Sequence, residues 1–148
     1  MEETIAELSL SSQDPRHVMS QFCRRFRAIW IGVDWTRIRS EETADEDLLP
    51  IFKDIHGTIL LLRNLVTTAH KYVILQASAH PNDVLDDFAV VTHDLAVYLD
   101  RAKYLCELLA HGKVQDREQF LQCRRLLVSR LRQIDDYAHK LLPSFIIQ

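Results

Sequence analysis

The feature that most constrains the fold is the spacing of the apolar residues, which recur at intervals of three and four along most of the chain. This spacing places the side chains on one face of an α-helix. The pattern therefore predicts an amphipathic helix that begins after Asn82 and ends at His111-Gly112. The residues that carry the pattern are Phe88, Val91, Leu95, Tyr98, Ala102, Leu105 and Leu109.

Three other segments show the same periodicity and predict helices over about 15–31, 47–78 and 116–142. Asp14 precedes the first of them and can cap its first turn. The stripe of the second segment is so wide that little of the helix is polar. We therefore expect this helix to be buried on several sides.

Glycine and proline are scarce, with three and four among 148 residues. Strands joined by tight turns need more of both. The connections after the second and third helices are only a few residues long, which forces neighbouring helices to run antiparallel. The sequence thus predicts an all-α, up-down-up-down bundle of four main helices, three of them long, at about 27–32 residues.

The length suits a single domain, and we expect one helical bundle over 14–148. Residues 1–13 are rich in Ser and Glu and are expected to form a flexible leader. A short extra helix is expected near 34–40. The apolar tail, 144–148, has two interpretations: it packs back on the bundle, or it docks on a partner.

The three cysteines are odd in number and none is near another, so we expect reduced thiols in a cytoplasmic or nuclear protein. The three glycines lie far apart, which excludes a phosphate-binding loop. The seven histidines include no Glu-x-x-His pair of the kind that di-iron bundles use. We therefore expect no metal and no cofactor. Charged residues interrupt the most apolar stretch, 55–79, so no transmembrane segment is predicted.

One pair of residues suggests catalysis. Six residues separate Arg132 from His139, and this Arg-x(4–6)-His spacing resembles the motif of HEPN-type helical ribonucleases, with Gln133 in the place of the usual polar residue. The resemblance implies RNA cleavage by Arg132 and His139. A solvent-exposed arginine, and a histidine near a helix C-terminus where the helix dipole favours positive charge, explain the same residues without catalysis.

Charge is unevenly distributed along the chain. Residues 14–40 hold six Arg against two Asp, and residues 113–142 hold seven Lys or Arg against four acids. Residues 83–100 hold five Asp and no Lys or Arg. One interpretation is a solvated surface with salt bridges between helices. The other is a basic face for an acidic peptide, a nucleic-acid backbone or anionic lipid.

The leading hypothesis is a non-catalytic protein–protein interaction module, an adaptor or scaffold that acts through a helix face. The partner would be another protein or the chain itself, as a homodimer. A HEPN-like ribonuclease and a basic-face nucleic-acid or lipid binder are the alternatives. Trp30 and Trp35 would either plug the core or anchor a partner. The candidate partner-binding residues are Trp30, Trp35, Arg24, Arg25, Arg124, Arg125, Arg130, Phe145 and Ile146.

Overall fold

The computed structural model describes residues 14–33, 45–79, 82–112 and 116–146, and in these ranges the protein is all-α. Four α-helices pack against one another, which confirms the predicted bundle. A short 3-10 helix follows the last of them. The elements are α2 (Pro15–Ile31), α4 (Asp45–Ala79), α5 (Asp83–Ala110), α6 (Arg117–Leu141) and η1 (Leu142–Phe145).

Three of the predictions concern residues outside the described ranges. They are the flexible leader over 1–13, the short helix near 34–40 and the partner-binding role of Trp35. The three long helices have 35, 28 and 25 residues. The longest, α4, begins two residues earlier than its predicted start at about residue 47. Pro50 therefore lies inside the helix rather than in its first turn.

Local side-chain caps start α2, α5 and α6, and the sequence predicts the first two of them. Asp14, Asn82 and Asp116 each accept a hydrogen bond from the backbone N–H two residues further on, at 2.8–3.0 Å. These bonds satisfy amide groups that have no partner inside the helix. Gly112 follows the C-terminus of α5 with a φ of 63°, a conformation that favours glycine.

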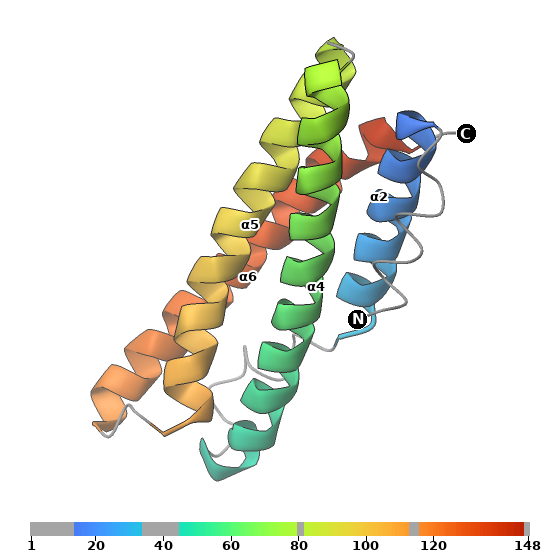
Figure 1. Cartoon of the computed structure of the whole chain (residues 1–148). Helices are drawn as coiled ribbons and strands as arrows, with labels where there is room; N and C mark the ends of the chain where they lie inside the picture. Colours follow the sequence, from blue (N-terminus) through green and yellow to red (C-terminus); the bar gives the residue numbers. More distant parts are fainter. Residues whose placement is uncertain (1–13, 34–44, 80–81, 113–115, 147–148) are drawn as a thin grey trace.

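Successive helices run in opposite directions, and α4 lies between α2 and α5 (Figure 1). The other main contacts join α5 to α6, and η1 contacts α2. Aromatic rings fix that end of the bundle: Phe22 of α2 meets Phe88 of α5 at 5.4 Å between ring centroids, and Phe145 meets Phe88 at 4.9 Å. Of the two interpretations of the tail, Phe145 follows the first and packs back on the bundle.

The second helix, α4, packs against helices on two sides but is less buried than its wide apolar stripe predicts. Nine of its described side chains are buried, against eleven in the shorter α5. Leu75 is 70% exposed and Ile74 is 46% exposed, because α4 contacts α5 and α2 but leaves another side to solvent. The wide apolar stripe of α4 thus exceeds what its neighbours cover.

Candidate binding groove between α2 and α6

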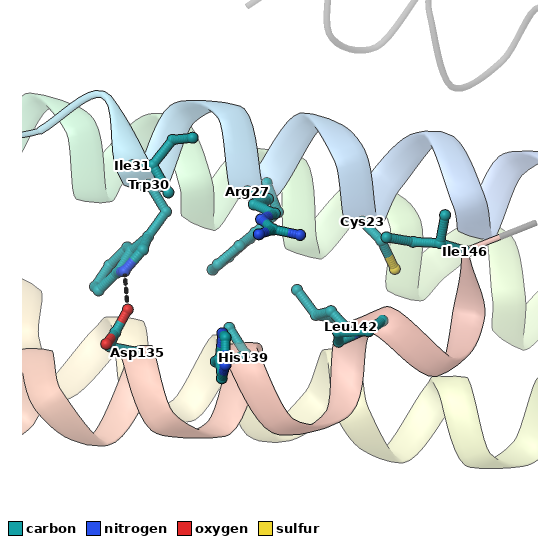
Figure 2. A pocket seen from close by; sticks show the side chains of 11 residues that line it. Cys23, Arg27, Trp30, Ile31, Asp135, His139, Leu142 and Ile146 are labelled. Carbon is teal, nitrogen blue, oxygen red and sulfur yellow. Dashed lines mark hydrogen bonds between the residues drawn. The ribbon is translucent and has the colours of Figure 1, made fainter.

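A cavity of about 130 Å³ lies between α2 and α6, where the chain turns into η1 (Figure 2). Trp30 and Asp135 stand at one end of it, and Ile146 stands toward the other. We call this cavity and its rim the α2–α6 groove. Its lining residues are Cys23, Phe26, Arg27, Trp30, Ile31, Asp135, Ala138, His139, Leu142, Pro143 and Ile146.

Side-chain size explains why the two helices leave a hollow here. The inward stripe of α6 carries Leu131 and Ile134, and the next residue in that stripe is Ala138. α2 contributes another small side chain, Cys23, to the lining. Two small residues in the lining leave a volume that larger side chains fill elsewhere in the core.

A hydrogen bond crosses the groove at one end. The Trp30 indole N–H donates to the Asp135 carboxylate at 2.7 Å, and the two residues are 105 positions apart in the chain. Trp30 is 5% exposed and its ring stacks on Phe26 with an interplanar angle of 15°. The indole is therefore a wall of the groove and not an exposed anchor for a partner.

The groove lies between two helices that are rich in basic residues. α2 carries four arginines and no acidic residue, and α6 carries six Lys or Arg against three acids. The charged and titratable residues that line the groove itself are Arg27 from α2 and Asp135 and His139 from α6. Arg27 is exposed at the rim, and exposed Arg24 lies three residues before it on the same side of α2. The α2 edge of the groove therefore favours an anionic group on the ligand.

The other predicted partner-binding residues are scattered. Arg25 and Arg130 are half-buried, and Arg125 is exposed. Arg124 is only 2% exposed, so the prediction that it belongs to an exposed basic face is wrong. The cause is its position in the inward stripe of α6, three residues before Leu127.

Cys23, His139 and Asp135 all line the groove, and these are the residue types of a thiol-dependent catalytic triad. The protonation of the thiol and the hydrogen bonding of the other two residues do not suit that chemistry. Cys23 is fully buried, and burial raises the pKa of its thiol to about 12. A cysteine nucleophile needs the thiolate, which this environment suppresses. The carboxylate of Asp135 accepts the hydrogen bond from Trp30, and His139 has no hydrogen-bond partner among the described residues.

Two pairs of histidine rings lie near one another along α4 and α5. The ring centroids of His56 and His111 are 6.0 Å apart, and His56 is 3.3 Å from Glu107. The ring centroids of His70 and His93 are 6.2 Å apart, and the Nδ1 atom of His70 is 2.9 Å from the hydroxyl of Thr92. In the part of the chain that the structure describes, no group of three or more His, Cys, Asp or Glu residues is arranged to hold a metal ion.

Arg132 and His139 are both exposed and lie seven residues apart on α6. Seven residues correspond to about 10 Å along the helix axis. His139 lines the groove, whereas Arg132 borders an open surface with Ser129 and Asp136. The ribonuclease interpretation of this pair stays a prediction.

Comparison of the chain with protein-family models, curated proteins and solved structures finds no match. No helix in the described ranges has an apolar stretch long enough to cross a membrane. The sequence did not single out the groove residues Arg27, Asp135 and Leu142. Asp135 and His139 are one helical turn apart, which is the signal that could have placed them on a common face.

Proposed function

We propose that the chain is a non-catalytic protein-interaction module that binds an acidic amphipathic helix of a partner protein in the α2–α6 groove. One observation carries the proposal: an apolar cavity the size of one side chain lies between two arginine-rich helices. The three free thiols support a cytoplasmic or nuclear setting for this interaction.

The size of the cavity favours an anchor residue over a cofactor or a small-molecule substrate. Pockets for small molecules usually enclose about 300–1,000 Å³. The cavity here has about 130 Å³. An apolar cavity of about 150 Å³ takes up benzene, so this volume suits one phenylalanine or leucine side chain.

Shape and charge define the rest of the ligand. A helix in a groove between two helices inserts apolar anchors on one face and keeps polar residues at the edges. Exposed Arg24 and Arg27 line one edge, so acidic residues on the ligand helix would meet cations there. A peptide with one aromatic anchor and flanking glutamates satisfies both conditions.

The test is a titration of the full chain with two synthetic peptides of about 15 residues, long enough for a helix to form on binding. One places a phenylalanine among glutamates, and the other replaces every glutamate with lysine. Trp30 lies in the wall of the groove, so its fluorescence reports binding. We expect the acidic peptide to bind at least about tenfold more tightly and its affinity to fall with added salt.

Three variants locate the site. Ala138→Leu fills the cavity and should abolish binding of the acidic peptide. Arg27→Glu should weaken binding of the acidic peptide. Lys71→Glu makes the same charge change at an exposed residue of α4 and should leave that binding unaltered. Equal binding of both peptides, or unchanged binding by Ala138→Leu, contradicts the proposal. Tighter binding of a single-stranded RNA than of the acidic peptide would also contradict it.

A further inference from the structure

Away from the groove, apolar side chains form a line on the solvent side of α5. Val90 is 59% exposed, Tyr104 is 62% exposed, and Val97 between them is half-buried. The seven-residue spacing keeps the three on one face of the helix over about 21 Å. Single exposed apolar residues are ordinary, but a line opposite the core is what a helix presents to a neighbour.

The line continues across a hollow onto α6. The hollow is lined by apolar residues from both helices, with Leu126 43% exposed, and by Asp100, Arg101 and Arg130 at its edges. Its apolar residues are Val97, Tyr104 and Leu105 from α5 and Leu126 from α6. We call this surface the α5–α6 face. It is separate from the α2–α6 groove: nine residues, two and a half helical turns, separate Leu126 from Asp135 and Arg130 from His139.

The exposed residues of the two helices differ in net charge. α5 exposes four Asp against one Arg, and α6 exposes four Lys or Arg against three acids, with Arg130 half-buried at the hollow. A two-fold axis parallel to the helices would place α5 of one copy opposite α6 of a second copy, so that acid meets base twice. An axis perpendicular to the helices would place α5 on α5, where like charges repel.

The area also suits a second copy. Helices of 25 and 28 residues are about 40 Å long, and a packed pair is roughly 20 Å wide. The face therefore offers on the order of 800 Å², which is what one partner buries in a stable interface of standard size. We infer that the chain forms a symmetric dimer in which the α5–α6 face of one copy packs on the same face of the other, α5 against α6.

Sedimentation of the full chain over a range of concentrations and salt tests this inference. We expect a reversible dimer whose dissociation constant rises with salt. Tyr104→Glu should raise the dissociation constant at least about tenfold, because an exposed tyrosine at an interface is a frequent hot spot. Leu75→Glu changes a 70% exposed apolar residue of α4 and should leave the dimer intact.

Cross-linking distinguishes the two arrangements. Cys123→Ser first removes a half-buried native thiol that lies three residues before Leu126. In that background, Tyr104→Cys and Leu126→Cys chains, mixed and oxidised, should form a disulfide-linked pair, while Tyr104→Cys alone should not. A linked pair from Tyr104→Cys alone would contradict the packing of α5 on α6. A strict monomer at every concentration, or equal weakening by Tyr104→Glu and Leu75→Glu, would overturn the inference. Both readouts are independent of peptide binding in the groove.

Discussion

The helix pairs α4–α5 and α2–α6 are joined in different ways. Along α4 and α5 the core positions are filled by large side chains with no exposed surface, among them Ile59, Leu62, Leu95 and Leu99. Polar contacts at the edges of this pair, such as the one between His56 and Glu107, supplement the apolar packing. Between α2 and α6 a cavity takes the place of closely packed side chains, and the 2.7 Å hydrogen bond from Trp30 to Asp135 spans it.

This difference separates stability from recognition. A filled seam buries apolar area and has no room for a ligand, whereas a hollow loses contacts and leaves apolar walls that a ligand can cover. The four predictions below test this division of roles, and they run from the largest expected effect to the smallest.

Leu95→Ala should cause the largest loss of stability. Leu95 is fully buried in α5, and truncating a buried leucine costs about 2–5 kcal/mol in free energy of unfolding. Leu142→Ala, at the wall of the groove, should cost less than about half as much, because part of its surface already faces a hollow. Urea denaturation measures both. Equal losses would mean that the groove wall is packed as tightly as the core.

Trp30→Phe should loosen the groove more than the rest of the bundle. It removes the indole N–H that donates to the Asp135 carboxylate, a charge-assisted bond whose loss costs about 1–2 kcal/mol at a partly buried site. Hydrogen exchange should quicken in α2 and change little in α4 and α5. Asp135→Asn keeps an acceptor oxygen and should have a smaller effect. Uniform acceleration across all helices would contradict a local role for this bond.

Ala138→Leu should stabilise the fold. Ala138 lines the cavity, and filling a cavity commonly adds about 0.5–1 kcal/mol. Ala102→Leu makes the same change in the filled part of α5, where the alanine is fully buried, and should destabilise by about 1–3 kcal/mol. The opposite signs are the measurable distinction between the two regions, and a loss of stability in both variants would mean that the cavity cannot accept a side chain.

Most of the fold could be predicted from the sequence because helix periodicity, caps and short loops are local signals. Asp14 and Asn82 act where the sequence places them, and the alternating helix directions follow from loop length. The groove could not be predicted, because no local signal shows that Cys23 and Ala138, two small residues far apart in the chain, line the same cavity.

The error at Arg124 has a different origin. Arg124 lies four residues after Phe120 and three before Leu127, so its spacing already placed it in the apolar stripe of α6. Assigning it to the exposed basic face followed its charge instead of its position. A long aliphatic stem lets arginine occupy such a stripe, and position was the better guide.

The smallest effect on stability is expected from the loss of the polar contact between His56 of α4 and Glu107 of α5. The hydrogen bond from His56, followed by the charge of Lys103, lowers the pKa of the Glu107 carboxyl. A carboxyl whose pKa is lowered by folding adds stability above its unfolded pKa, and that stability is lost as the pH falls through the folded pKa. Glu107→Gln should therefore lower the urea midpoint near neutral pH, and the two proteins should converge once the pH falls below the lowered pKa of Glu107.

The response of stability to salt distinguishes the His56–Glu107 contact from the apolar packing beneath it. Glu107 is solvent-accessible, so the difference between the two proteins should shrink as ionic strength rises. The loss caused by Leu95→Ala should not respond to salt, because it comes from buried apolar contacts. If Glu107→Gln instead costs as much as Leu95→Ala at every pH and salt concentration, the α4–α5 pair depends on its polar edge and not on its filled seam.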